Sequence, residues 1–244
     1  MTISESARRS DYSCYAPQEA FIVPLLKQHI ERVLSEHLKP IKISDRVLDV
    51  GCGEQPFRKQ LKDLGYTYTG IDVSQNSQET VDVICKIDQS LPNELMELGS
   101  FELIFCTEVM EHVVDWDTAF FNLSQLLSSK GKLFITCPYF YQLHEEPHDF
   151  WRPTPYALQH FAKKNNLIVI QQENAGDAWD VLGTLLANVY SLPFSRTFQD
   201  RLLNRIVNLC KRLLFKLLRD RYIQSHVKLQ SPLYMSNIFL CEKQ

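Results

Sequence analysis

The chain has 244 residues, which suits one domain with insertions or a domain plus a small appendage, and which is long enough to bury a sizeable core. Its apolar content of 45% and charged content of 23% are ordinary for a globular protein. The net charge of −3 gives no general attraction to nucleic acid, so no nucleic-acid partner is expected.

Seven cysteines occur, and none forms a C-x-x-C pair. They are expected to be reduced, mostly buried thiols in a cytosolic protein. The N-terminus lacks the apolar region of a signal peptide, and no run of about 18 apolar residues could form a spanning helix. We therefore expect a cytoplasmic protein.

The first predicted element is a helix over 17–38, where apolar residues recur at helical spacing. Short strand-like runs then alternate with helical segments. Strands are predicted at 46–50, 66–71, 81–84, 101–106, 132–137 and 167–171, and helices at 54–65, 115–128 and 155–164. This alternation predicts an α/β fold, with a parallel, doubly wound sheet covered by helices on both faces.

The alternation stops after residue 177. Residues 178–222 have a helical pattern throughout, and only 234–241 then reads as a final strand. We therefore divide the chain into an N-terminal helical segment (1–40), a main domain (41–177 and 229–244) and a helical insertion (178–228).

The segment VLDVGCGEQPF, residues 47–57, joins a buried strand to a helix through two glycines. Glycines allow close approach of a ligand, and a helix start presents free N–H groups. Asp72 ends the next strand, 19 residues beyond Gly53, where a carboxylate can hold two ribose hydroxyls. This order predicts an adenosine-containing cofactor. Pro56 occupies the third glycine position of a dinucleotide fingerprint, so a pyrophosphate site is disfavoured.

The string DVGCG resembles motif I of the class I S-adenosylmethionine-dependent methyltransferases, in a type 11-like form. GIDVS (70–74), IDQSLP (87–92), FCTEVMEHV (105–113) and GKLFITCPY (131–139) are similar to the later motifs of that family, in order. The resemblance implies a Rossmann-like sheet of about seven strands, with the last one antiparallel. It also implies S-adenosylmethionine as the cofactor.

By that resemblance, nine residues surround the cofactor. The methionine moiety is assigned to Asp49, Gly51 and Gly53, the ribose and adenine to Asp72, Val73, Asp88 and Gln89, and the sulfonium end to Thr107 and Glu108. Gln55 stands where many members have a third glycine, and its side chain could crowd the loop. From the residues alone, Glu108 and Glu111 could instead lie on a solvated helix face.

Residues 144–151 read HEEPHDFW and match the zinc-peptidase pattern H-E-x-x-H. Pro147 excludes that function, because it prevents the helix that would bring the two histidines together. We expect no metal, although His144, Glu145, His148 and Asp149 are all possible ligands.

The stretch 138–155 is instead expected to overhang the cofactor as a substrate lid. Its candidate substrate-binding residues are Tyr139, Tyr141, Asp149, Trp151 and Arg152. Trp151 and Arg152 could alternatively only fasten the loop.

Methyl transfer to a hydroxyl needs a base, or a group that holds the hydroxyl proton, and the candidates are His112, His144, His148 and Asp149, with one of the three histidines expected as the base. The lid sequence resembles a methyltransferase subgroup of bacterial glycan and polysaccharide pathways. We therefore expect O-methylation of a sugar, a glycan or a related small metabolite. The alternatives are a lipid-linked or quinone-like acceptor at a membrane surface, and a binding module without catalysis.

Residues 201–219 form a basic amphipathic helix, with an apolar stripe on one face and arginines and lysines opposite. Over 201–221, seven basic residues and Asp220 give 7 − 1 = +6. Three partners could cover the stripe: the domain itself or a second subunit in a homodimer, an anionic membrane at its inner face, or nucleic acid.

Overall fold

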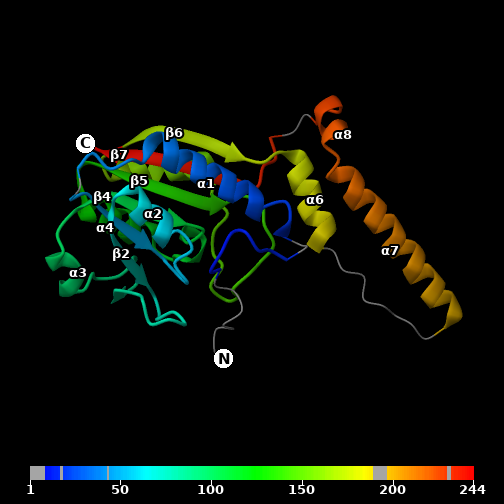
Figure 1. Cartoon of the computed structure of the whole chain (residues 1–244), viewed down its shortest axis with the longest axis horizontal. Helices are drawn as coiled ribbons and strands as arrows, with labels where there is room; N and C mark the ends of the chain where they lie inside the picture. The colour runs from blue at the N-terminus through cyan, green and yellow to red at the C-terminus, as the bar shows by residue number, and fades with distance from the viewer. Residues whose placement is uncertain (1–8, 17–18, 43, 189–196, 230–231) are drawn as a thin grey trace.

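The computed structural model describes residues 9–16, 19–42, 44–188, 197–229 and 232–244. Its centre is a seven-stranded sheet in the order β3-β2-β1-β4-β5-β7-β6 (Figure 1). The strands are β1 (Arg46–Val50), β2 (Thr67–Asp72), β3 (Val83–Ile84), β4 (Phe101–Thr107), β5 (Leu127–Pro138), β6 (Leu167–Ala175) and β7 (Ser236–Lys243). Strands β1 to β5 pair in parallel, and β7 runs antiparallel to both of its neighbours. The predicted Rossmann-like fold is confirmed.

Helices cover both faces of the sheet. Successive side chains of a strand point to opposite faces, and both sets are apolar in β4, so each face needs a layer of helices to bury it. In β4, Leu103 and Phe105 pack under α1 (Val23–His37), α2 (Arg58–Leu64) and α6 (Ala178–Asn188). Ile104 and Cys106 pack under α3 (Asn93–Glu97), α4 (Trp116–Leu126) and α5 (Pro155–Lys164). A strand buried on both faces reads as a continuous apolar run, as FELIFC does.

Several elements differ from their predicted bounds. Helix α2 begins at Arg58 rather than 54, because Gln55 has φ +57° and Pro56 follows it. Helix α1 begins at Val23, and residues 17–18 lie outside the described part of the chain. Strand β5 starts at Leu127, so residues 127–128, which were predicted to end the helix, belong to the strand instead. A short 3₁₀ turn, η2 (Met110–His112), was not predicted.

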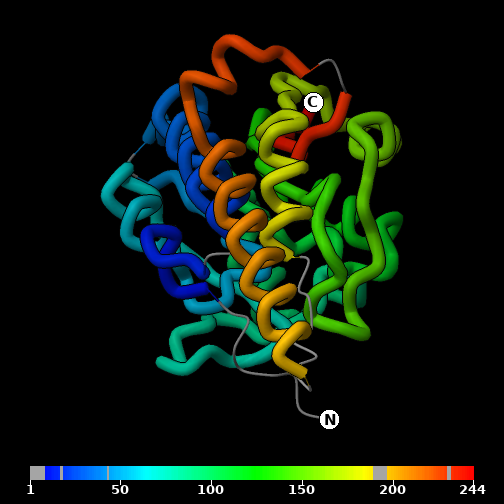
Figure 2. Tube along the Cα trace, turned by 90° about the vertical axis from the view of Figure 1, so that its right-hand side faces the viewer, coloured from blue at the N-terminus to red at the C-terminus, as the bar shows by residue number. Residues whose placement is uncertain are grey.

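The predicted helical insertion contains α6, α7 (Phe198–Leu218) and α8 (Arg221–His226), and residues 189–196 lie outside the described part. The Asp220 carboxylate accepts hydrogen bonds from two N–H groups of α8, so the chain turns there. Helix α7 projects from the sheet domain, and from the side it lies in front of α6 (Figures 1 and 2). Among the described residues, no helix is long and apolar enough to cross a membrane.

Candidate functional site

The glycine loop lies at the carboxyl end of β1 and has the backbone shape expected for a ligand cradle. Gly51 and Gly53 have φ of +66° and +49°. A Cβ on Gly51 would lie 2.4 Å from a methyl of Val109, so this position requires glycine. A Cβ on Gly53 would meet no atom within 4 Å, so space is open above the loop.

Gln55 does not crowd this loop. Its amide donates to the Thr80 carbonyl at 2.7 Å, and its oxygen accepts from Arg58 at 2.8 Å. The side chain is buried against the next loop, which removes the objection raised by the missing third glycine.

Two buried aspartates flank the loop. Asp72 ends β2 and accepts a hydrogen bond from the Gly53 N–H at 2.9 Å. Asp49 accepts from the Tyr68 hydroxyl at 2.6 Å, and burial raises its pKa to about 7. Carboxylates at a strand end beside open space fit a ligand with ribose hydroxyls and a cationic amino acid moiety. The residues present therefore fit S-adenosylmethionine.

We expect Asp49→Asn to stabilise the protein above about pH 7. Between the ordinary carboxyl value of 3.8 and about 7, the folded state holds a proton that the unfolded state has released. The stability of the wild type therefore falls as pH rises through this window. Asparagine cannot ionise and can still accept from Tyr68. Thermal unfolding against pH tests this, with exposed Asp63→Asn as the control. Parallel curves for the wild type and Asp49→Asn would contradict it.

The other residues assigned to the cofactor lie along the same sheet edge. Val73 is 53% exposed after β2, and Gln89 is exposed. Asp88 accepts from the Asp115 N–H at 3.4 Å. Thr107 ends β4, and the Glu108 carboxylate accepts from the Ser236 hydroxyl at 3.0 Å. Their individual roles stay predictions.

The stretch 144–148 forms turns and not a helix, as expected from the presence of Pro147. The lid is fastened to η2 by its backbone. The N–H groups of Phe150 and Trp151 donate to the Glu111 carbonyl at 2.8 and 3.2 Å, and the Trp151 indole donates to the Val113 carbonyl at 2.9 Å. The lid therefore lies beside the segment that follows β4.

Hydrogen bonds and an ion pair also connect residues within the lid. Arg152 holds both oxygens of Asp149, at 2.6 and 2.7 Å, and donates to the Gln142 carbonyl at 3.0 Å. These contacts favour a fastening role for Trp151 and Arg152, and substrate binding by them stays a prediction. Tyr139 stacks on Tyr234 of the segment before β7, with ring centroids 4.2 Å apart.

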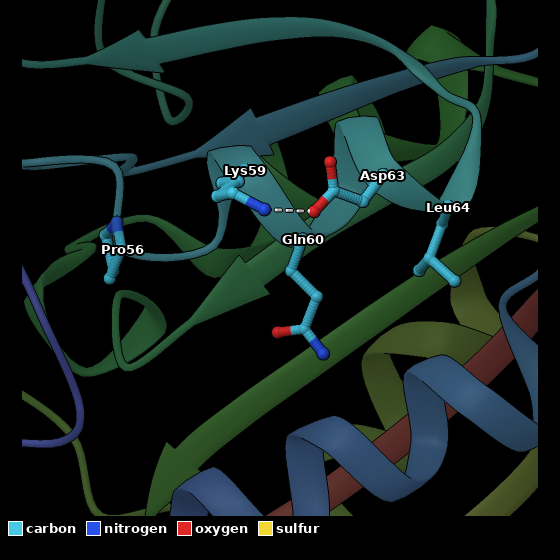
Figure 3. Close-up of a pocket in the computed structure, with 5 residues that line it drawn as sticks. All are labelled: Pro56, Lys59, Gln60, Asp63 and Leu64. Carbon is cyan, nitrogen blue, oxygen red and sulfur yellow. Dashed lines mark hydrogen bonds and ion pairs between the residues drawn. The ribbon is translucent and has the colours of Figure 1, made fainter.

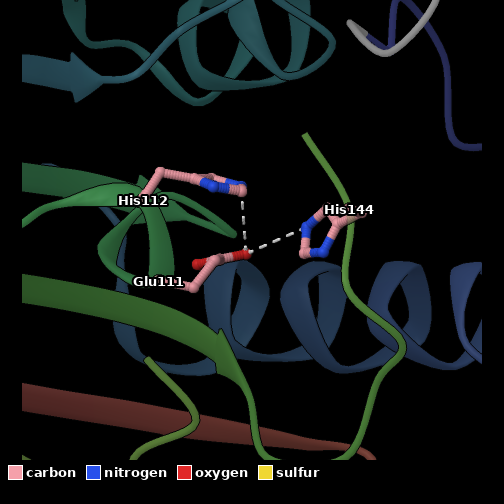
Figure 4. Close-up of side chains that lie close together, drawn as sticks. All are labelled: Glu111, His112 and His144. Atoms are coloured by element: carbon pink, nitrogen blue, oxygen red, sulfur yellow. Dashed lines mark ion pairs between the residues drawn. The ribbon is translucent and has the colours of Figure 1, made fainter. Parts of the chain in front are cut away.

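His112 and His144 meet at a buried carboxylate (Figure 4). Glu111 is fully buried, so a solvated position for it is wrong. Its Oε1 has no hydrogen-bond partner and lies 3.8 Å from Nε2 of His112 and 3.9 Å from Nε2 of His144. The His148 side chain is exposed, and only its carbonyl takes part, 2.7 Å from Nδ1 of His112.

The partners of each imidazole determine which nitrogen is free. A carbonyl only accepts, so His112 Nδ1 must donate to His148. His144 Nδ1 lies 3.2 Å from an Asp149 oxygen and 3.3 Å from the Gln142 carbonyl, so it donates as well. In its neutral form, each ring therefore presents an unprotonated Nε2 toward Glu111. Burial lowers the pKa of His144, which favours this neutral form. Burial, with Glu108 nearby, raises the pKa of Glu111.

The ligand atoms of Glu111, His112 and His144 lie within 4.8 Å of one another and could hold a divalent ion. A zinc ion about 2.1 Å from each would bring these atoms to roughly 3.4 Å apart, so the cluster would have to contract. A hydroxyl oxygen between them would lie about 2.5–3 Å from each, which is hydrogen-bonding distance without contraction.

We therefore keep the expectation that no metal is needed. Incubation with EDTA followed by gel filtration should leave the methyl-transfer rate unchanged. Loss of the rate, with recovery on adding Mg²⁺ or Zn²⁺, would contradict this expectation.

Tyr12 is a site residue that the sequence did not reveal. Its ring packs on Phe57, beside the glycine loop, at 4.9 Å. Burial raises its pKa, and the charges of Glu108, Glu111 and Asp49 act in the same direction. The N-terminal segment thus packs beside the cofactor loop. No local pattern around Tyr12 indicates this position.

An open pocket of about 370 Å³ lies on α2, lined by Pro56, Lys59, Gln60, Asp63 and Leu64 (Figure 3). It contains the Lys59–Asp63 ion pair, at 2.5 Å, and none of the candidate cofactor-binding, substrate-binding or catalytic residues. We assign it no role in the reaction.

The strand order, the glycine loop with Asp72, and the polar cluster after β4 define a class I S-adenosylmethionine-dependent methyltransferase. The model of the family described as "Methyltransferase domain" matches residues 22–180. The chain belongs to this family, so the predicted class, enzyme activity and cofactor are confirmed.

Proteins with similar sequences match part of the chain, and a protein of similar structure matches most of it. The human mitochondrial ubiquinone biosynthesis O-methyltransferase is 29% identical over 128 residues, which cover 47% of this chain and 34% of that protein. The ubiquinone biosynthesis O-methyltransferase of Pelagibacter ubique is 33% identical over 104 residues, covering 40% and 43%. The chain thus spans less than half the length of these two relatives. A methyltransferase structure from Archaeoglobus fulgidus aligns with a TM-score of 0.55 at 14% identity, covering 93% and 97%, and supports the fold.

Proposed function

We propose that the enzyme methylates a hydroxyl group, with His144 as the base. The observation that carries this proposal is the buried Glu111 Oε1, without a hydrogen-bond partner and facing two imidazole Nε2 atoms. These atoms surround a point at hydrogen-bonding distance from all three, where an acceptor hydroxyl fits.

Each residue of the site has a separate role in methyl transfer. Asp49, Asp72 and the glycine loop hold S-adenosylmethionine, which supplies an electrophilic methyl group. His144 accepts the hydroxyl proton at Nε2, while Asp149 fixes the ring through Nδ1. A protonated Glu111 carboxyl, which burial favours, donates to the acceptor oxygen and holds it in line, while His112 lines the same point and the lid excludes water. The leaving sulfide is neutral, so no acid is needed.

For the acceptor, we propose a phenolic hydroxyl of a quinol-like compound. The relatives named above act in ubiquinone biosynthesis, and none of them is named for a sugar. A phenol has a pKa of about 10, which is far closer to the pKa of an imidazole than the pKa of a sugar hydroxyl is. Transfer of the phenol proton to His144 therefore costs less free energy.

A glycan hydroxyl is the second candidate, supported by the aromatic side chains of the lid. Methyl-labelled S-adenosylmethionine, offered with catechols, quinol lipids and extracted glycans, separates the two. Label only in the glycan fraction would overturn the phenol, and label only on nitrogen or carbon would overturn hydroxyl methylation.

A further inference from the structure

Helix α7 carries an apolar face that the described part of the chain leaves uncovered. Among its described residues, only Leu218 is buried. Eight other apolar side chains are between 41% and 61% exposed: Leu202, Leu203, Ile206, Val207, Leu209, Leu213, Leu214 and Leu217. The apolar stripe of α1, by contrast, is buried at five positions.

The contact between α7 and the domain uses a different side of the helix. Phe215 meets the edge of Phe21 at 5.2 Å, and Leu218 packs beside Phe21 and Trp179. Both residues lie in the last turn of α7, with Leu218 at the edge of the apolar face and Phe215 on the side away from it. The rest of the helix extends away from the sheet (Figure 1), and its apolar side chains are exposed.

The polar face is strongly basic. Arg201, Arg205, Arg212, Lys216 and Arg219 are exposed and lie opposite the apolar stripe. Asp200, the one acid within α7, belongs to the capping box of its first turn. The helix therefore combines a wide apolar face with flanks of a single charge sign.

We propose that α7 lies in the surface of an anionic lipid membrane, with its apolar face among the acyl chains and its basic side chains at the headgroups. A second copy of the chain fits less well, because like charges would flank the seam on both helices. Nucleic acid would leave the apolar face in water. The proposal does not depend on the acceptor or on methyl transfer.

Co-sedimentation with vesicles tests this proposal. The full chain should sediment with vesicles of equal parts phosphatidylcholine and phosphatidylglycerol, and not with phosphatidylcholine alone. Each arginine removed in Arg205→Gln and Arg212→Gln should weaken binding by about fivefold. The double variant Ile206→Ser, Leu213→Ser should lose binding, whereas Asn208→Ser, on the polar face, should retain it.

The serine variants replace exposed side chains, so they should keep the wild-type circular dichroism and affinity for S-adenosylmethionine. Absence of sedimentation with anionic vesicles, or unchanged sedimentation of the double variant, would overturn the proposal. So would a dimer in sedimentation velocity that dissociates in Ile206→Ser, Leu213→Ser, because a second copy would then cover this face.

Discussion

Replacing Asp72 with alanine is expected to weaken S-adenosylmethionine binding by roughly 100-fold or more. The carboxylate is 7% exposed at the end of β2, where one oxygen already orients the Gly53 N–H. Two charge-assisted hydrogen bonds to ribose hydroxyls contribute about 1.5–3 kcal/mol each, and about 1.4 kcal/mol corresponds to tenfold in affinity. Titration calorimetry measures the loss directly.

The variant Asp72→Asn separates charge from shape. Asparagine can still accept from Gly53, so the loop should keep its conformation while affinity falls by an intermediate amount. Asp63→Ala, at an exposed position on α2, is the matched control and should bind as the wild type does. Affinity of Asp72→Ala within about twofold of the wild type would remove Asp72 from the cofactor site.

The geometry of the glycine loop and of Asp72 could be predicted because its determinants are local. Gly51 and Gly53 mark a backbone with positive φ, and Asp72 follows one strand later at a fixed spacing. Parallel strands bring such segments to the same sheet edge, whatever the details of packing. Gln55 shows that one position can depart from the motif when its side chain finds a partner outside the loop.

The sequence also named His112 and His144 as candidate bases, but their meeting at a buried Glu111 could not be predicted, because it depends on contacts between distant segments. A regular helix after β4 would place Glu108 and Glu111 on one exposed face. The structure instead has φ +53° at Glu108 and a single 3₁₀ turn, which directs Glu111 inward. His144 reaches it only because the lid folds back. Tyr12 arrives from the N-terminal segment, far away in the sequence.

The sequence shows that α7 is amphipathic, but it does not show what contacts the apolar face of this helix. Periodicity identifies an apolar face without showing what covers it. The same pattern is buried by the sheet in α1 and left open in α7. Only the tertiary structure distinguishes the two, and the basic flanks then indicate the surface that α7 would contact.

Replacing His144 with alanine is expected to lower kcat by roughly 100- to 10,000-fold, the range for loss of a general base. Affinity for S-adenosylmethionine should stay within about twofold, since His144 belongs to the lid and not to the cofactor loop. Asp149→Asn should also lower kcat, though less, because it disturbs the orientation of the ring and leaves Nε2 in place. Single-turnover rates with labelled cofactor measure both.

The pH dependence distinguishes a base from a residue that only fastens the lid. His144 must be neutral to accept a proton, and burial lowers its pKa below the ordinary value of 6.5. The wild-type rate should therefore fall only at a pH below 6.5, and this acid limb should disappear in His144→Ala. His148→Ala is the matched control within the same lid: its ring is exposed and only its carbonyl meets His112, so its rate should stay near that of the wild type. A large loss in His148→Ala, with little change in His144→Ala, would transfer the role of base to His148.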